Sequence, residues 1–188
     1  ALKKSIRVTD EVIQKDILLH FPYHTFDHVT ELLREAAMDP DVKEIKITAY
    51  RLAENSKVIN ALVNASRNGK LVTVMLELRA RFDEEANIEW KNRLEEEGVK
   101  VLLGVPNMKV HAKACLIKKR VNNKTIQYGF VSTGNLNEDT SNVYGDHCLL
   151  TANRKVMADI NRIFQFLENP LVSRLKFLRQ CKTLIVCP

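Results

Sequence analysis

Two apolar runs decide the fold of this chain: Lys43-Glu-Ile-Lys-Ile-Thr-Ala-Tyr50 and Leu71-Val-Thr-Val-Met-Leu-Glu-Leu78. Both are typical of β-strands, and the shorter run at residues 99–103 is typical of a third. Helix-like segments separate the runs. Ser56 caps the first of these segments, which continues to about residue 68, and the second covers residues 83–97. Strands and helices that alternate in this order indicate a parallel βαβαβ unit.

The pattern changes after this unit. Residues 109–118 and 125–131 are strand-like, and the polar turn Asn122-Asn123-Lys124 between them predicts an antiparallel hairpin. The other expected elements are a strand at residues 145–151 and amphipathic helices at residues 26–37 and 154–168. We therefore expect an α/β fold with a mixed sheet, a parallel βαβαβ start plus an antiparallel hairpin, flanked by helices.

The expected domain covers residues 23–170. Residues 1–22 have the character of a connecting arm. Residues 171–188 have that of a linker and first strand toward a missing following domain, so we expect this chain to be a piece of a longer one.

Composition narrows the possible partners. With 188 residues, 45% of them hydrophobic, the chain can bury a core, and its net charge of +6 favours an anionic partner without identifying it. The four cysteines form no CxxC pair, which favours reduced, buried thiols in a cytosolic protein. The apolar runs are too short for a membrane span.

Val110-His111-Ala112-Lys113 and Ser132-Thr-Gly-Asn135 carry the chemical signal. Side chains two apart in a strand face the same side, so His111 and Lys113 would place an imidazole beside a positive charge. An imidazole with its unperturbed pKa of about 6.5 has a free lone pair at neutral pH. The turn ending at Asn135 would add backbone N–H groups and an amide, which suit phosphoryl oxygens. From spacing alone, an ordinary strand histidine and a turn-forming asparagine remain the alternative.

The motif resembles that of the phospholipase D superfamily. This resemblance implies a phosphoenzyme intermediate on His111, with Lys113 and Asn135 holding the phosphoryl oxygens. The superfamily pattern also has an acidic residue five positions after the lysine. Here that position is Lys118, which argues against ordinary phosphodiesterase activity.

Five ordered blocks resemble the bacterial polyphosphate kinase family, the type that phosphorylates itself on histidine. The blocks are residues 16–26, 47–51, 80–87, 109–113 and 133–138. The resemblance implies a larger enzyme with an N-terminal helical part, a head domain and two related phospholipase D-like domains, of which this chain matches the first.

The resemblance also implies roles for individual residues. His111 would attack the terminal phosphate of ATP, or of polyphosphate in the reverse direction, to give a phosphohistidine, and Lys113 and Asn135 would hold the phosphate. Arg51 and Arg81 match two arginines of the family's magnesium-phosphate site, and Tyr144 matches a tyrosine that contacts the nucleotide. Without the family, a surface ion pair or a solvated charged face is the more common role of such arginines, although their place at the ends of predicted parallel strands favours a ligand site.

The implied cofactor and substrates are Mg²⁺, ATP or ADP, and polyphosphate, with no nucleic acid. The implied partners are the remaining domains of the enzyme and further copies in a homo-oligomer. We expect a cytoplasmic protein and leave membrane association of the intact enzyme open. The isolated fragment should be inactive or weakly active, because the second histidine would lie in the following domain. Two alternatives stay open: a phospholipase D-like phosphodiesterase or nuclease whose half-sites pair in a dimer, and a non-catalytic domain that binds polyanions.

Overall fold

The computed structural model describes residues 7–50, 52–53, 55–77, 84–106 and 108–170. Within these ranges the strands are β1 (Ile17–Phe21), β2 (Val42–Ala49), β3 (Leu71–Leu76), β4 (Lys100–Leu103), β5 (Lys113–Val121), β6 (Lys124–Ser132) and β7 (Asp146–Thr151). The helices are α1 (Val8–Gln14), α2 (Asp27–Met38), α3 (Lys57–Arg67), α4 (Glu84–Glu96) and α5 (Arg154–Glu168), with a 3-10 turn, η1 (Thr140–Asn142).

All these strands belong to one mixed sheet, in the order β1-β7-β6-β5-β2-β3-β4. β2, β3 and β4 run parallel to one another. β5 joins β2 in the antiparallel sense, and β6, β7 and β1 continue antiparallel from it. The sheet therefore confirms the expected parallel start and antiparallel hairpin.

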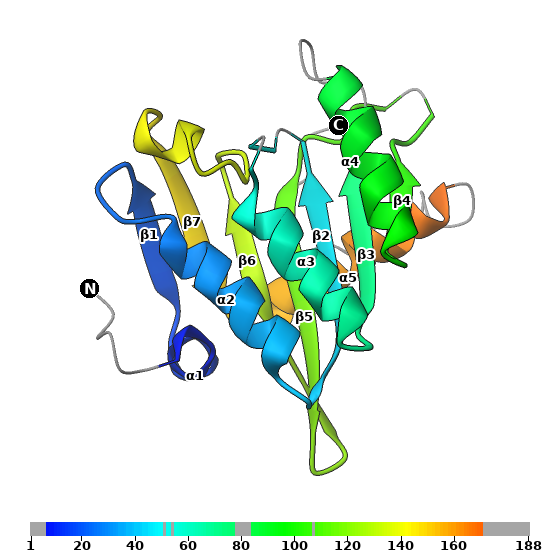
Figure 1. Cartoon of the computed structure of the whole chain (residues 1–188). Helices are drawn as coiled ribbons and strands as arrows, with labels where there is room; N and C mark the ends of the chain where they lie inside the picture. The colour runs from blue at the N-terminus through cyan, green and yellow to red at the C-terminus, as the bar shows by residue number, and fades with distance from the viewer. Residues whose placement is uncertain (1–6, 51, 54, 78–83, 107, 171–188) are drawn as a thin grey trace.

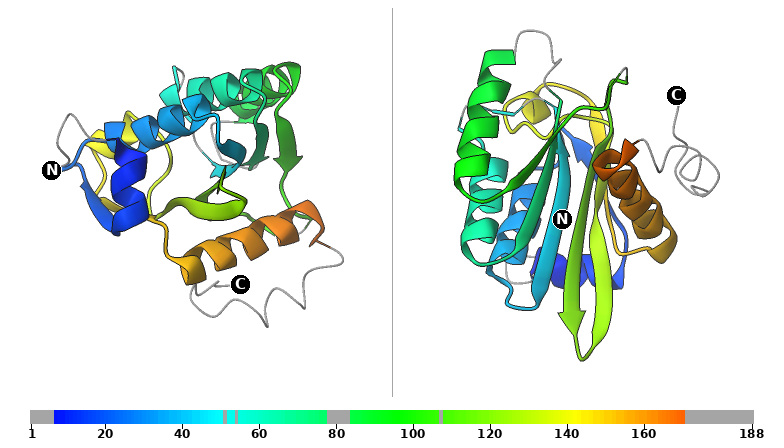
Figure 2. Two further views of the ribbon diagram at one scale, coloured as in Figure 1. Left: turned by 90° about the horizontal axis from the view of Figure 1, so that it is seen from below. Right: turned by 90° about the vertical axis from the view of Figure 1, so that its right-hand side faces the viewer.

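Helices cover both faces of the sheet. α2, α3 and α4 lie along one face, and α5 crosses the other (Figures 1 and 2). The larger core includes Leu32 of α2, Leu62 of α3 and Ile45 of β2, all fully buried. The smaller core joins α5 to the sheet through residues such as Phe164 and Leu116.

Capping and turn residues explain where several helices and strands begin or end. Ser56 Oγ accepts a hydrogen bond from the Ile59 N–H at 3.3 Å and so caps α3 as expected. Asn122 and Asn123 adopt φ values of 49° and 60°, the left-handed conformation required by a two-residue type I′ hairpin turn. Asn153 Oδ1 accepts from the Lys155 N–H at 3.0 Å at the start of α5.

Residues 7–21 lie packed against the domain, although their sequence is typical of a connecting arm. β1 pairs with β7 over its whole length. α1 is fastened to α2, because the Glu35 carboxylate accepts the N–H groups of Val8 and Thr9, both at 2.8 Å. The boundary suggested after residue 22 therefore does not separate these elements from the sheet. Residues 171–188, the expected linker and strand, lie outside the described residues.

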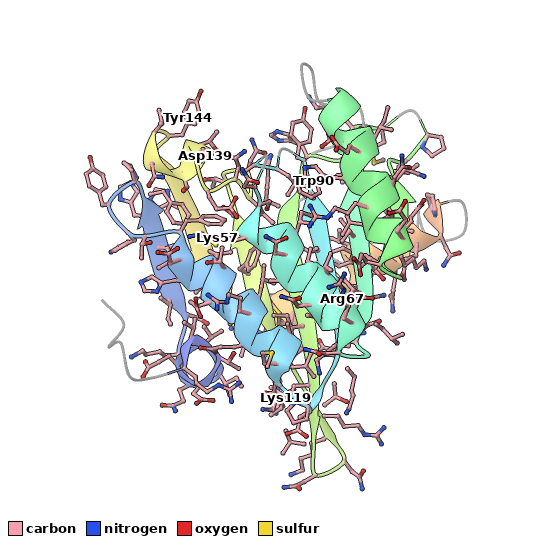
Figure 3. All side chains as sticks on the ribbon, in the orientation of Figure 1. Lys57, Arg67, Trp90, Lys119, Asp139 and Tyr144 are labelled. Carbon is pink, nitrogen blue, oxygen red and sulfur yellow. The ribbon has the colours of Figure 1, made fainter. Side chains whose placement is uncertain are left out.

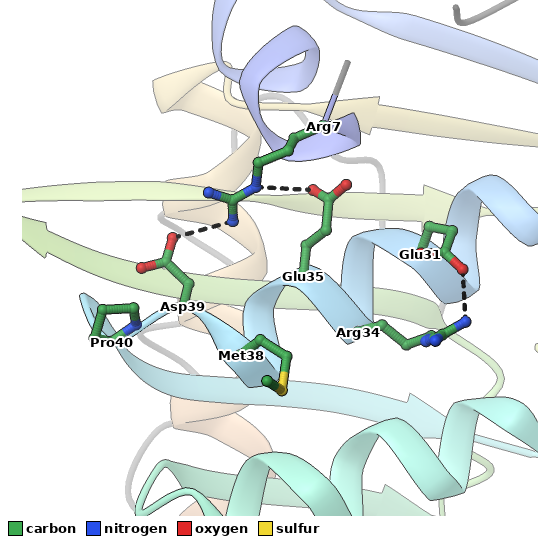
Figure 4. Close-up of a pocket in the computed structure, with 7 residues that line it drawn as sticks. All are labelled: Arg7, Glu31, Arg34, Glu35, Met38, Asp39 and Pro40. Carbon is green, nitrogen blue, oxygen red and sulfur yellow. Dashed lines mark hydrogen bonds and ion pairs between the residues drawn. The ribbon is translucent and has the colours of Figure 1, made fainter. Parts of the chain in front are cut away.

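A buried carboxylate, Asp39, stands at the end of α2 next to α1 (Figure 4). Its oxygen Oδ2 lies 2.7 Å from Lys119 Nζ and 3.5 Å from Arg7 Nη2, and Arg7 also pairs with Glu35. Burial raises the pKa of Asp39, but bonds from Lys119 and the Asp41 N–H and the charges of Lys119 and Arg7 hold it below its usual range. This cluster ties α1, α2 and β5 together at one end of the sheet.

β1 is the outermost strand on its side of the sheet. At His20 its backbone bonds to the turn that follows: the His20 N–H donates to His24 Nδ1, and the His24 N–H donates to the His20 carbonyl, both at 2.8 Å. The His20 ring stacks on that of His147 in β7, with centroids 4.5 Å apart. Both backbone groups of this edge residue therefore have partners.

Cys115 and Cys148 are buried free thiols, in agreement with the reduced state expected from the sequence. Burial raises the pKa of Cys148 to about 12, so both its position and its charge state make it unreactive. Cys181 and Cys187 lie outside the described residues. In the described part of the chain, no helix is long and apolar enough to cross a membrane.

Gly129 of β6 lies against the backbone of β5 where there is no room for a side chain. A Cβ added there would lie 2.0 Å from the Cys115 carbonyl oxygen, and its φ is +158°. We predict that Gly129→Ala lowers the free energy of unfolding by about 3 kcal/mol or more, because backbone must move to admit the methyl group.

Gly145→Ala is the matched control, because nothing lies within 4 Å of its added Cβ. It should change stability by less than about 0.5 kcal/mol. Urea unfolding of both variants provides the measurement, and equal stabilities would contradict the close approach.

Candidate phosphoryl-transfer site

The candidate site lies at the end of the sheet where β2 and β3 finish and β5 begins. His111 precedes β5 and is exposed, whereas Lys113, the first residue of β5, is only 6% exposed. The sequence pattern predicts a strand that already includes His111. In the structure the strand starts at Lys113, four residues after the predicted start at residue 109 and two residues after His111.

The Thr48 hydroxyl explains the later start. The β2–β5 ladder ends where Ile47 lies opposite Cys115. Beyond that pair, Thr48 Oγ1 donates to the Ala112 carbonyl at 2.7 Å and accepts from the Ala114 N–H at 3.0 Å. A buried side chain thus takes the place of a backbone partner, and the segment that carries His111 leaves the ladder.

His111 and Lys113 still meet as the spacing predicts. Lys113 Nζ lies 2.8 Å from His111 Nε2. An ammonium group is a donor only, so Nε2 is the accepting, unprotonated nitrogen when the lysine carries its charge. The pair therefore presents a nucleophilic atom together with the cation that would neutralise a phosphoryl group.

Tyr50 supports this pair from the end of β2. Its ring lies edge-on to the imidazole of His111, with centroids 5.1 Å apart at 84°. The Nζ atoms of Lys113 and Lys109 each lie 5.3 Å from the centre of the Tyr50 ring, a favourable cation–π distance. Sequence reasoning gave Tyr50 no role. The signal that could have found it is its place directly after a strand, where ligands of open α/β sheets gather.

Asn135 belongs to the turn that follows β6. Lys113 lies opposite Ser132 in the β5–β6 pair, so this turn leaves the sheet at the end that carries His111. The Thr133 hydroxyl donates to Asp146 Oδ1 at 2.7 Å, and the Gly134 N–H donates to Ser132 Oγ at 3.2 Å. Asn135 Oδ1 is buried and accepts no hydrogen bond from the described residues.

Glu138 joins this turn to α3. Its Oε1 accepts the N–H groups of Lys57 at 2.7 Å and Val58 at 3.2 Å, the first residues of the helix. A carboxylate at this position satisfies free helix N–H groups and complements the helix dipole. Glu138 falls within the family block at residues 133–138, but the sequence alone indicates no role for it, because its partners lie about 80 residues away.

Of the other predicted site residues, the structure describes some and not others. Tyr144 is 62% exposed and lies two residues before the start of β7, next to the segment that carries Asp139 (Figure 3). Arg51 and Arg81 lie outside the described residues. Lys118, where the superfamily has an acid, pairs with Glu44 at 2.6 Å within the sheet.

The described residues offer no evident cage for a metal ion. No group of three or more His, Cys, Asp or Glu side chains in these ranges could hold one. A guanidinium has five donors and no acceptor, so Arg51 and Arg81 would bind phosphate oxygens and not Mg²⁺ itself.

The fold is that of a phospholipase D-like domain. The structure is similar to that of a phospholipase D family member, NUC, from Salmonella typhimurium, with a TM-score of 0.63 and 15% identity over 82% of this chain and 94% of that chain. NucT from Helicobacter pylori gives the same score and identity over 89% of this chain and 97% of that one. At this identity the likeness shows the fold alone.

Residues 7–172 match the family model of polyphosphate kinase C-terminal domain 1, and the chain belongs to this family. It is 49% identical to the polyphosphate kinase of Escherichia coli K12 over 161 residues and 50% identical to that of Vibrio vulnificus YJ016. Each match covers 86% of this chain but 23% of the relative.

The crystal structure of polyphosphate kinase from Porphyromonas gingivalis gives a TM-score of 0.77 and 42% identity, over 88% of this chain and 28% of that one. The chain thus spans about a quarter of its relatives.

Removal of the Glu138 carboxylate should weaken the link between the turn and α3. We predict that Glu138→Ala lowers the free energy of unfolding by about 1–2 kcal/mol, because two helix N–H groups lose their acceptor. Asp139→Ala is the neighbouring control, since Asp139 is exposed, and it should stay within about 0.5 kcal/mol of the parent. Urea unfolding measures both, and a Glu138→Ala protein as stable as the control would contradict the assignment.

Proposed function

We propose that this chain is the first phospholipase D-like domain of a polyphosphate kinase and that His111 carries the phosphoryl group during reversible transfer between ATP and polyphosphate. The observation that carries the proposal is the 2.8 Å contact between His111 Nε2 and Lys113 Nζ, in a chain of this family. Fold similarity to the phospholipase D family members does not favour a phosphodiesterase. Lys118 stands where their superfamily pattern has an acid, and it is engaged by Glu44.

The transfer consists of two displacements at phosphorus. His111 Nε2 attacks the terminal phosphorus of ATP, an N–P bond forms, and the bond from that phosphorus to the bridging oxygen breaks as ADP leaves with the electron pair. A terminal oxygen of polyphosphate then attacks the same phosphorus. The N–P bond breaks, the imidazole regains its lone pair, and the chain is one phosphate longer.

Lys113 would change partners during the first step. Before substrate binds, its ammonium occupies the Nε2 lone pair that must attack phosphorus. The oxygens of an incoming phosphoryl group compete for the ammonium, so binding would free the nucleophile and place the cation where charge develops.

Asn135 would donate its amide N–H to a phosphoryl oxygen, Arg51 and Arg81 would bind further oxygens, and Tyr144 would contact the nucleotide. Mg²⁺ would enter bound to the phosphates of ATP.

The remaining domains complete the proposed enzyme. The relatives are about four times as long as this chain, and we place the second half-site, with its own histidine, in the part that follows. On this proposal the isolated chain is inactive or weakly active, and the intact enzyme is a cytoplasmic homo-oligomer that does not act on nucleic acid.

Labelling with ATP tests the proposed nucleophile. The intact protein that carries this chain is incubated with ATP that is radioactive in its terminal phosphate. We expect acid-labile, base-stable label that disappears in His111→Ala and persists in His28→Ala, since His28 lies on α2 outside the site. Absence of label in the parent protein, or its persistence in His111→Ala, would overturn the proposal.

Lys113 gives a second measurement. Lys113→Ala should reduce the initial rate of phosphohistidine formation by about 100-fold, because the main cation beside the transferred group is lost. Lys155→Ala, an exposed lysine of α5, controls for the loss of one positive charge from the domain. A rate in Lys113→Ala within a few-fold of the control would rule out the proposed role of this ammonium.

A further inference from the structure

A buried carboxylate, Glu77, lies at the end of the sheet that carries His111. It directly follows β3, and only 3% of the residue is exposed. A carboxylate next to a site for phosphates repels the substrate, and its burial costs free energy unless strong hydrogen bonds offset it. The hydrogen bonds of Glu77 therefore indicate which part of the site this carboxylate stabilises.

Glu77 holds the backbone of the residue before the nucleophile. Its Oε2 accepts the N–H of Val110 at 2.9 Å. A charged acceptor makes this bond stronger than one between neutral groups. The Val110 side chain is buried in the smaller core with α5, so both its backbone and its side chain are fixed.

Glu77 is itself held by its neighbours. Its N–H donates to the Ala49 carbonyl at 3.1 Å, and its carbonyl accepts from Asn87 Nδ2 of α4 at 3.1 Å. The same Asn87 amide lies 3.4 Å from the carbonyl of Tyr50, whose ring contacts His111. The buried side-chain amide of Asn87 thus connects Glu77, which holds the backbone before His111, with Tyr50, whose ring contacts the imidazole of His111.

The backbone on the other side of His111 is fixed by Thr48. Its hydroxyl bonds the Ala112 carbonyl and the Ala114 N–H. The nucleophile is therefore an exposed side chain on a backbone that is anchored one residue before it and one residue after it. Such anchoring suits a reaction in which the attacking atom must be aligned with phosphorus.

We propose that Glu77 is a positioning residue for phosphoryl transfer, which fixes the backbone before His111 through its bond to the Val110 N–H. The inference rests on the proposed function of His111. It predicts that the rate of phosphohistidine formation depends more on the length of the Glu77 side chain than on its negative charge.

Two substitutions separate reach from charge. Glu77→Asp keeps the carboxylate but withdraws it from the Val110 N–H by one methylene, whereas Glu77→Gln keeps an accepting oxygen at the original length. In the intact enzyme we expect Glu77→Asp to slow phosphohistidine formation at saturating ATP by about 10- to 100-fold, because a displacement near 1 Å costs that much in an aligned reaction. Glu77→Gln should retain most of the rate.

Three comparisons decide the outcome. The affinity for ATP should stay within about two-fold in both variants, since a displaced nucleophile affects the chemical step and not ground-state binding. Glu89→Asp, on an exposed position of α4, should leave both quantities unchanged. A rate in Glu77→Asp equal to that of the parent, or a parallel loss of ATP affinity, would overturn the inference.

A readout that needs no kinase activity separates this inference from the proposed function. Diethyl pyrocarbonate acylates accessible imidazoles, and mass spectrometry reports the rate at His111 and, as an internal reference, at His147. We expect Glu77→Asp to raise the rate several-fold at His111 only, because the imidazole is less firmly held against Lys113. Failure of the parent to label with ATP would refute the proposed function, whereas unchanged acylation in Glu77→Asp would refute the positioning role.

Discussion

The antiparallel pairing of β2 with β5 is the interaction on which the site depends. It joins the parallel half of the sheet to the antiparallel half, so the carboxyl end of β2 meets the amino end of β5. Ligand sites of open sheets form where the strand order changes direction, and this is such a point. Tyr50, at the end of one strand, and Lys113, at the start of the other, come together because this pairing is in register. A shift of one residue would turn Lys113 to the opposite face of the sheet and away from Tyr50.

Sequence alone predicted the parts of the fold that depend on neighbours along the chain. The bounds of α5 agree with the amphipathic pattern at residues 154–168, and the polar turn at Asn122 and Asn123 joins β5 and β6 into the expected antiparallel hairpin. These signals are local, since caps, turn residues and helical periodicity act within a few positions. The contact between His111 and Lys113 was likewise predictable from a spacing of two residues.

The hydrogen bonds that hold the backbone around His111 could not be predicted from local sequence signals. Thr48 meets residues 64 and 66 positions away, and Glu77 meets one 33 positions away. Nothing in the sequence near Thr48 indicates that its hydroxyl will replace a backbone partner, so the strand was predicted to start too early. The packing of residues 7–21 also depends on distant partners, Glu35 and β7. A single sequence contains the groups that interact but not the pairing that brings them together.

The bonds between His20 and His24 have a consequence for how the molecule can associate. An outer strand with unpaired backbone groups is a template for another strand, from a second molecule or from another domain. Near the carboxyl end of β1, the turn satisfies both backbone groups of His20 and thus caps the sheet within the chain. Growth of the sheet by strand addition is therefore blocked at this point, and an associating chain would have to contact side chains here instead of extending the sheet past His20.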